Sequence, residues 1–295
     1  MLRSPAAPAV FAAVVLALSG CATSGRNALA ASDEGSPTLS PSEQNLRVMT
    51  YNIHAGREGV ANVAKVIREA NPDVVGLQEV DRFTTRLGSK GGDQLEELSK
   101  ATGLPYTAYF KASNFYGGEY GLAILSRYPL EEAAQRGLPT ENSERRTAGR
   151  AVVKAPGGEV MVYVTHLTNL PIRSKLRVQQ ARHILAWMAE DNRPRMLMGD
   201  FNDSVDSAPL ETLKAKLTEA FGRAGRGPSH TYPFTVLPNI RLDYVFASSE
   251  LTPTDVRVIH AKASDHYPIV ADFKQTQPLV ISTPPESAPA AGSSR

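Results

Sequence analysis

The chain has 295 residues, 42% of them hydrophobic, and a formal net charge of +2 at pH 7. This length and apolar content allow one large domain, or two smaller ones, with a substantial core, and they exclude disorder throughout. The small net charge excludes polyanion binding by bulk charge, so any phosphate-rich partner must meet local basic groups.

The N-terminus is typical of an export signal. Arg3 gives a short basic region, and the apolar run over residues 9–18 is too short to cross a bilayer comfortably. The order Leu18-Ser19-Gly20-Cys21 resembles the lipobox of bacterial lipoproteins. This resemblance predicts a signal segment over residues 1–21 in which Cys21 receives the lipid and becomes the mature N-terminus.

Cys21 is the only cysteine, so an exported protein would contain no internal disulfide. The alternative is a conventional signal cleaved near Ala30 or Ala31. A lipid anchor would hold the domain on the periplasmic side of the outer membrane, or on the extracytoplasmic face of the cell membrane, without a spanning helix. Residues 22–45 predict a flexible linker, and residues 275–295 predict a disordered tail.

Residues 46–274 alternate between segments typical of strands and segments typical of helices. Strands are predicted at 46–54, 73–80, 106–111, 120–127, 150–154, 160–166, 196–198, 242–246, 256–260 and 269–273. Helices are predicted at 62–70, 92–102, 174–189 and 209–215. Because several strands follow one another without an intervening helix, this pattern favours a single α/β domain with mixed sheets.

Polar side chains recur where these strands end. The apolar run Met196–Met198 turns at once into Gly-Asp-Phe-Asn, so Asp200 and Asn202 would face one spot, since side chains two apart on a strand point the same way. Taken alone, this is also the composition of an ordinary turn. The whole set of such residues is Asn52, Glu79, His166, Asp200, Asn202, Asp243, Asp265 and His266. Gathered in one cleft, their oxygens suit Mg²⁺ or Mn²⁺, and the two imidazoles can move protons.

The segments that carry these residues resemble a known family in content and order. They are Thr50-Tyr51-Asn52-Ile53-His54, Leu77-Gln78-Glu79-Val80, Gly199-Asp200-Phe201-Asn202, Leu242-Asp243-Tyr244 and Ser264-Asp265-His266-x-Pro268. They are similar to motifs of the endonuclease/exonuclease/phosphatase superfamily, which includes DNase I, abasic-site endonucleases, bacterial sphingomyelinases and inositol polyphosphate 5-phosphatases. The resemblance implies a DNase I-like four-layer α/β sandwich, in which two mixed sheets pack face to face with helices outside.

The resemblance also implies metal-dependent attack of water on a phosphoester. Glu79 would be the principal ligand of Mg²⁺ or Mn²⁺, with Asp265 and Asn52 in the metal shell or its water network. A metal ion in such a site acts as a Lewis acid on a phosphate oxygen.

The proton-transfer and phosphate-binding roles follow from the same motifs. Asp200 would orient or deprotonate the attacking water, and His266 would act as base or donate to the phosphate, with Asp243 orienting its ring. The base is therefore assigned to Asp200 and His266 jointly. Asn202 would hold a phosphate oxygen, and His166 would bind phosphate or protonate the leaving oxygen.

One arginine is a further candidate. Arg150 opens a predicted strand where the family places a phosphate-contacting arginine, although a solvated charge at a strand edge is the alternative. Arg145 and Arg146 are interpreted as surface residues. We interpret the four remaining histidines as packed or surface residues; they are His54, His183, His230 and His260.

These observations predict a phosphodiesterase that acts on a phospholipid head group or a small phosphodiester at the cell envelope. A monomer held on the membrane by its lipid is expected. An extracytoplasmic nuclease is the alternative, although no regular interleaving of aromatic and basic residues favours nucleic acid. An inactive binding lipoprotein is a third reading, and the completeness of the polar set argues against it.

Overall fold

The structure is a computed structural model that describes residues 45–86, 91–141, 144–170, 172–233 and 239–275. The predicted signal segment, Cys21 and nearly all of the predicted linker and tail lie outside the described residues. Among the described helices, none is both long and apolar enough to cross a membrane.

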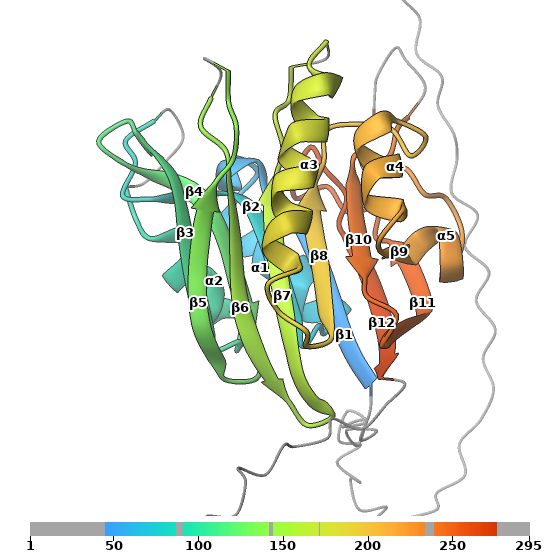
Figure 1. The fold of residues 1–295 in the computed structure, drawn as a ribbon. Coiled ribbons are helices and arrows are strands. Elements are labelled where there is room, and N and C mark those ends of the chain that lie inside the picture. The colour runs from blue at the N-terminus through green and yellow to red at the C-terminus, as the bar shows by residue number, and fades with distance from the viewer. Residues whose placement is uncertain (1–44, 87–90, 142–143, 171, 234–238, 276–295) are drawn as a thin grey trace, which may run out of the picture. The chain divides into compact units, whose positions relative to one another are not determined.

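Two six-stranded mixed sheets form the centre of the domain (Figure 1). The first sheet consists of β1 (Asn45–Asn52), β2 (Val74–Arg82), β3 (Tyr106–Phe115), β4 (Gly118–Ser126), β11 (Leu251–Val258) and β12 (Ile269–Gln275), in the spatial order β11-β12-β1-β2-β4-β3. The second consists of β5 (Leu130–Gly137), β6 (Thr147–Ala155), β7 (Gly158–His166), β8 (Arg195–Asp200), β9 (Thr218–Glu219) and β10 (Asp243–Ala247), in the order β5-β6-β7-β8-β10-β9. The pairs β1–β2 and β7–β8 are parallel.

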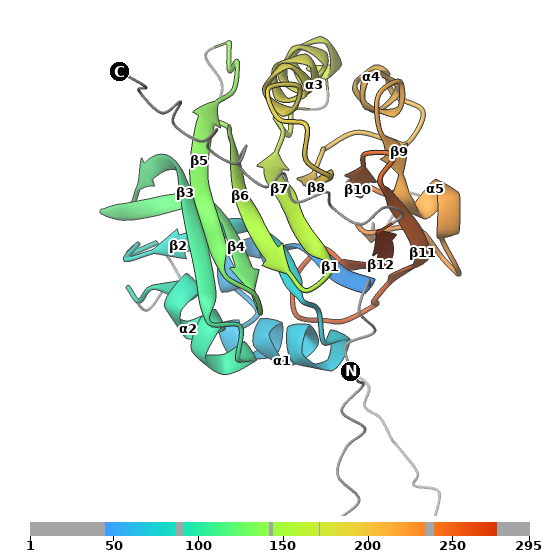
Figure 2. The same cartoon turned by 60° about the horizontal axis from the view of Figure 1, so that its bottom comes forward.

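Helices cover the outer face of each sheet (Figure 2). The helices α1 (Val60–Ala70) and α2 (Gln94–Thr102) lie on the first sheet, and α3 (Ser174–Met188) and α4 (Ala208–Lys214) lie on the second. A short 3-10 helix η1 (His54–Gly56) follows β1, and α5 (Ala220–Ala224) follows β9. This order of layers, helix on sheet on sheet on helix, confirms the predicted four-layer sandwich.

The alternation of side chains along β8 shows how the sequence divides itself between the layers. Met196 and Met198 are buried between the sheets, whereas Leu197 is buried against α3 and α4. Because successive side chains of a strand point to opposite faces, the same alternation directs Asp200 into the space between the sheets. The apolar alternation of β8 therefore places the carboxylate of Asp200 on the inner face of the sheet.

Most predicted elements are present, and the exceptions have clear causes. The edge strand β5, Leu-Glu-Glu-Ala-Ala-Gln-Arg-Gly, has no β-branched or aromatic residue, so pattern alone gave no sign of it. It is a strand because it pairs with β6. The short β9 and α5 lie between the predicted helix at 209–215 and the predicted strand at 242–246, where the sequence pattern predicted neither a helix nor a strand. Likewise, β11 begins at Leu251, whereas the prediction began it at residue 256.

The close contact between the two sheets can be tested by a substitution at Gly149. A Cβ at Gly149 of β6 would lie 2.1 Å from the ring of Phe110 of β3, a side chain only 2% exposed. We expect Gly149→Ala to lower the free energy of unfolding by about 1–3 kcal/mol, because the ring has no free space to enter. Gly137→Ala is the matched control, since a Cβ there meets nothing within 4 Å. Urea unfolding of both variants measures the difference, and equal stability would contradict this packing.

Candidate active site

The polar residues predicted from strand ends meet at one end of the sandwich. His166 ends β7, Asp200 ends β8 and Asp243 begins β10, and both His166 and Asp243 are paired in register with Asp200. Figure 1 shows β8 rising toward this end and β10 descending from it. Three neighbouring strands of the second sheet thus bring an imidazole and two carboxylates together, and each of these residues is at most 4% exposed.

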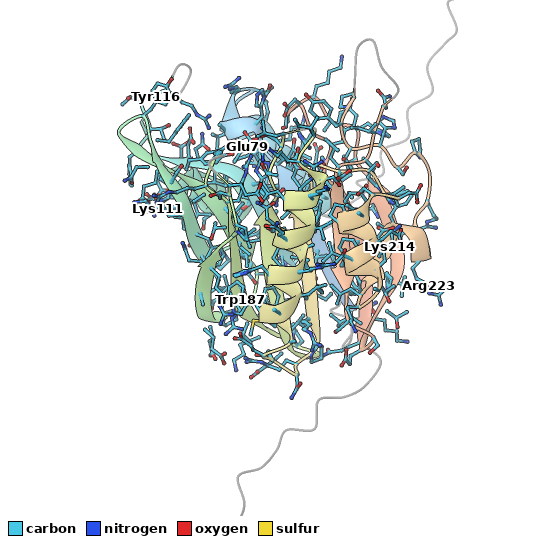
Figure 3. All side chains as sticks on the ribbon, turned by 45° about the horizontal axis from the view of Figure 1, so that its top comes forward. Glu79, Lys111, Tyr116, Trp187, Lys214 and Arg223 are labelled. Carbon is cyan, nitrogen blue, oxygen red and sulfur yellow. The ribbon has the colours of Figure 1, made fainter. Side chains whose placement is uncertain are left out.

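The first sheet contributes Asn52 and Glu79. Asn52 ends β1, and its Nδ2 donates to Asp200 Oδ2 at 3.1 Å and to Glu79 Oε1 at 3.3 Å. Glu79 sits in β2 at a register shift between Leu77 and Val80, with a φ of +58°. This bulge redirects the strand next to the site. Figure 3, in which this end comes forward, shows Glu79 near its centre.

His266 comes from the loop before β12 and is held on both sides. Its Nδ1 lies 2.8 Å from Asp243 Oδ2, and its backbone N–H donates to Ser264 Oγ at 3.2 Å. Ser264 Oγ in turn donates to the carbonyl of Asn52 at 2.7 Å. The ring of Tyr232 packs edge-on against the imidazole, with centroids 4.8 Å apart. These contacts fix the direction of the other ring nitrogen, Nε2.

Both histidine rings turn Nε2 toward one oxygen of Asp200. The distance from Asp200 Oδ2 is 3.4 Å for His166 and 3.7 Å for His266. Burial raises the pKa of Asp200; the nearby charge of His266 opposes this effect, and that of Asp243 adds to it. Burial alone would lower the pKa of His266, but the carboxylates of Asp243 and Asp200 outweigh it and raise the pKa. Asp200 therefore holds a proton more readily than an ordinary aspartate, and His266 is charged at neutral pH.

His166 has the opposite character. Burial, together with the positive charges of Arg146 and His266, lowers its pKa well below the usual range, so the ring is neutral at neutral pH. Its Nδ1 is buried and has no hydrogen-bond partner among the described residues. The site thus pairs one charged imidazole with one neutral imidazole.

Arg146 was misjudged from the sequence as a surface residue. Only 4% of the residue is exposed, its Nη2 lies 3.2 Å from Glu144, and its Nε has no hydrogen-bond partner in the described part of the chain. Its charge acts on His166 and on the buried hydroxyl of Tyr120. Its position directly before β6 was the feature of the sequence that could have identified it. Ala148 of β6 pairs with Thr165, which precedes His166, so the start of β6 lies beside the site.

Arg150, the predicted phosphate contact, lies elsewhere. Its guanidinium is 5.0 Å from the ring centroid of Trp187, and its Nη1 donates to the hydroxyl of Tyr163 at 3.3 Å. Both aromatic residues belong to the layer between the second sheet and α3, and Figure 3 places Trp187 well away from Glu79. The prediction is wrong because the strand alternation turns Arg150 to the outer face of the sheet.

Asn202 and Asp265 lie beside the site with part of their polar groups engaged. Asn202 donates its backbone N–H to Asp200 Oδ1 at 2.9 Å and its Nδ2 to the carbonyl of Leu167 at 3.1 Å. Asp265 is 38% exposed at its side chain, and its Oδ1 lies 3.7 Å from Nδ1 of His54. His54, which we interpreted from the sequence as a packed or surface residue, therefore borders the site.

The oxygen donors next to Asn52 fit a divalent cation. No lysine or arginine of the described chain forms an ion pair with Glu79, and its carboxylate is held only by the amide of Asn52. The carboxylates of Glu79 and of the partly exposed Asp265 offer the hard oxygens that Mg²⁺ or Mn²⁺ takes, whereas the amide oxygen of Asn52 already accepts from the backbone N–H of His54. Glu79, with Asn52 and Asp265 nearby, has the right chemistry for the predicted metal.

A second group of ligand atoms belongs to Asp200, Asp243 and His266, which all lie within 4.8 Å of one another. His266 Nδ1 already contacts Asp243, and the raised pKa favours the imidazolium. Because a histidine must be neutral to bind a metal, this group fits proton transfer better than metal binding.

Comparison with known families agrees with this geometry. The sequence pattern described as "Endonuclease/Exonuclease/phosphatase family" matches residues 49–266, which is well over half of the chain. The chain belongs to this family. The resemblance inferred from the motifs is thereby confirmed, and the family's own name describes phosphoester hydrolases.

Relatives of this family member cover about four fifths of the chain. The uncharacterized protein YbhP of Escherichia coli K12 is 30% identical over 248 residues, which cover 78% of this chain and 96% of YbhP. An endonuclease/exonuclease/phosphatase structure from Beutenbergia cavernae is 27% identical, with a TM-score of 0.70, over 80% of this chain and 72% of that one. The mannosyl-6-phosphatase Bt3783 of Bacteroides thetaiotaomicron shares the fold at 19% identity, with a TM-score of 0.63 over 77% and 99% of the two chains.

The contact between Asp243 and His266 makes a prediction about the charge on the ring. In Asp243→Asn, the carboxylate that favours the imidazolium is gone, so the pKa of His266 should fall. An NMR titration of the imidazole nitrogens, with protein kept free of metal by EDTA, measures it. Asp255→Asn is the control, because Asp255 pairs with Arg226 and Arg257 on β11. An unchanged His266 titration in Asp243→Asn would show that this carboxylate does not set the charge.

Proposed function

We propose that this protein is a divalent-metal-dependent phosphodiesterase that acts on a phospholipid head group or a small phosphodiester at the cell envelope. One observation carries the hydrolase assignment: polar contacts run without a break from Asp243 through His266 and Asp200 to Asn52 and Glu79. This series of contacts therefore joins proton-transfer groups to a carboxylate suited to a metal. An inactive homologue would be expected to have lost at least one of these residues.

A bound Mg²⁺ or Mn²⁺, held by Glu79 with Asn52 and Asp265 nearby, would polarise a phosphate oxygen and offset the charge that develops on it. Asp200 accepts a proton from the attacking water, a role that suits a carboxylate with a raised pKa. Asn52 holds Asp200 for this step through its amide.

The positive groups of the site act on the phosphate. His266, kept charged by Asp243, donates through Nε2 to a phosphate oxygen, and Arg146 adds a second positive charge on the side of His166. Neutral His166 donates a hydrogen bond to the phosphate without adding a further positive charge. Preorganised donors of this kind stabilise the negative charge that grows as phosphorus becomes five-coordinate.

The envelope location and the choice of a diester rest on the N-terminal sequence. If Cys21 is lipidated, the catalytic domain works beside phospholipid head groups, linked to them by a flexible segment. An extracytoplasmic nuclease would use the same site, and the mannosyl-6-phosphatase Bt3783 has the same fold. The assay must therefore separate the three substrate classes.

The test is hydrolysis by the full chain of four substrates: bis-p-nitrophenyl phosphate, p-nitrophenyl phosphate, plasmid DNA and phospholipid vesicles. Each is assayed with Mg²⁺, Mn²⁺ or EDTA. We expect turnover of the diesters that requires metal and falls at least ~100-fold in Glu79→Ala and in His266→Ala. The first variant loses the proposed ligand of the metal, and the second loses the charged donor to the phosphate.

Glu211→Ala, an exposed carboxylate on α4, is the control and should keep full activity. Circular dichroism of all variants excludes unfolding as the cause of any loss. Activity that persists in EDTA would refute the metal requirement. Efficient nicking of plasmid DNA without release from any lipid or small diester would establish the nuclease instead.

A further inference from the structure

Thr231 connects the two segments that carry Asp243 and His266. It lies in the loop before β10 and is fully buried. Its Oγ1 accepts from the backbone N–H of Asp243 at 3.1 Å and from that of Leu242 at 3.0 Å. Its carbonyl accepts from the backbone N–H of Tyr267, the residue after His266, at 2.7 Å. One residue therefore holds the backbone on both sides of the contact between Asp243 and His266.

Thr231 takes the place of a neighbouring strand at this end of β10. On one side, Asp243 pairs in register with Asp200 of β8. On the other side, β9 pairs with β10 at Phe246 and Ala247, which lie at the far end of the strand. At the near end, the N–H of Asp243 donates to Thr231 instead. Because a buried N–H without an acceptor is costly, this hydroxyl oxygen holds the start of β10 in place.

The carboxylate of Asp243 depends on this backbone for its position. Its Oδ2 lies 2.8 Å from Nδ1 of His266, whereas its Oδ1 is buried and has no hydrogen-bond partner among the described residues. With one oxygen unpartnered in this way, the carboxylate is anchored mainly through its own backbone. A shift of that backbone therefore changes the contact with the imidazole directly.

We propose that Thr231 is a positioning residue for the pair of Asp243 and His266. Because Thr231 is fully buried, it acts through the backbone of Asp243 and not on the substrate. The inference rests on the proposed function, in which His266 donates through Nε2 to a phosphate oxygen. Loss of the hydroxyl releases the start of β10, so the carboxylate no longer sets the direction of the ring. A small misplacement of this kind slows the chemical step more than it weakens binding.

Two substitutions separate the hydroxyl from the shape of the side chain. Thr231→Val keeps nearly the same shape but has no acceptor, whereas Thr231→Ser keeps the acceptor. With bis-p-nitrophenyl phosphate, we expect kcat of Thr231→Val to fall about tenfold while KM changes less than about twofold. In Thr231→Ser, kcat should stay within about twofold of wild type. Equal kcat in wild type and Thr231→Val, or an equal loss in Thr231→Ser, would overturn the proposal.

Ser248→Ala is the matched control. Ser248 follows the opposite end of β10, and its Oγ accepts from the backbone N–H of Arg195, the first residue of β8, at 3.0 Å. This variant also loses an acceptor for a backbone N–H, so urea unfolding should show a lower free energy of unfolding for it, as for Thr231→Val. Its kcat should match wild type, because the lost bond is at the other end of the strand. A loss of kcat as large as that of Thr231→Val would show that reduced stability alone is the cause.

A double-mutant comparison tests whether Thr231 acts through Asp243. In the Asp243→Asn background, Thr231→Val should change kcat by less than about twofold, because the carboxylate that the hydroxyl positions is already absent. If Thr231→Val lowers kcat as much in this background as in wild type, the hydroxyl acts elsewhere and the proposal is wrong.

A spectroscopic measurement tests the same contact without turnover. A carboxylate only accepts, so Nδ1 of His266 donates its proton to Asp243, and this proton should give a low-field NMR resonance in protein kept free of metal by EDTA. His266 is only 5% exposed, which slows exchange of the proton with water. The resonance should be the same in wild type and Thr231→Ser, and lost or shifted in Thr231→Val.

The NMR result and the activity separate the two proposals. An identical resonance in Thr231→Val would overturn the positioning role even if the enzyme is active. A resonance that changes as expected, in a protein whose wild type hydrolyses no phosphoester with Mg²⁺ or Mn²⁺, would refute the proposed function and leave the structural link between Thr231 and Asp243 intact.

Discussion

The close packing of the two sheets is the constraint on which the site depends. A Cβ at Gly76 of β2 would lie 2.6 Å from Sδ of Met198 in β8, so the sheets approach as closely as they do only because this position lacks a side chain. Asp200 lies two residues beyond Met198 on β8, and Asn52 lies two residues beyond Thr50, the β1 residue that pairs with Gly76. At these strand ends Asn52 can therefore reach across to Asp200. A wider spacing would separate the carboxylate suited to a metal from the groups that move protons.

Three residues at this end of the sandwich have a left-handed backbone conformation. Glu79, Asn202 and His54 have φ values of +58°, +52° and +49°, in the left-handed region that side chains rarely adopt. Each is held by hydrogen bonds: Glu79 by Asn52, Asn202 by Asp200 and Leu167, and the backbone of His54 by Asn52 at 3.1 Å. Such strain persists where surrounding contacts over-determine the geometry, and it is concentrated at functional sites.

The charges of the site are balanced by their neighbours. Asp243 keeps His266 charged, whereas burial and the charge of Arg146 keep His166 neutral. One fold therefore supplies two imidazoles in different states at one pH, which is the general way in which neighbouring groups take different roles in proton transfer.

The sequence by itself determined the mixed α/β architecture and most of the polar residues that meet at one end of the sandwich. Local pattern sufficed because a strand's apolar alternation fixes which face each side chain takes, and because Asn52, His166 and Asp200 stand where strands end. Glu79 instead lies at the register shift within β2, which continues to Arg82. Each of these residues lies in a short run of neighbouring residues, so it could be found from this one sequence.

Tertiary structure alone decided the rest. Strand β5 exists because β6 pairs with it, since its own residues do not favour a strand. Arg146 and Arg150 both sit near a predicted strand start, and only the packed sheets show that the first is buried toward His166 and the second lies over Trp187. Burial and facing direction at an element's edge depend on which segments pack there, and no local pattern encodes those neighbours.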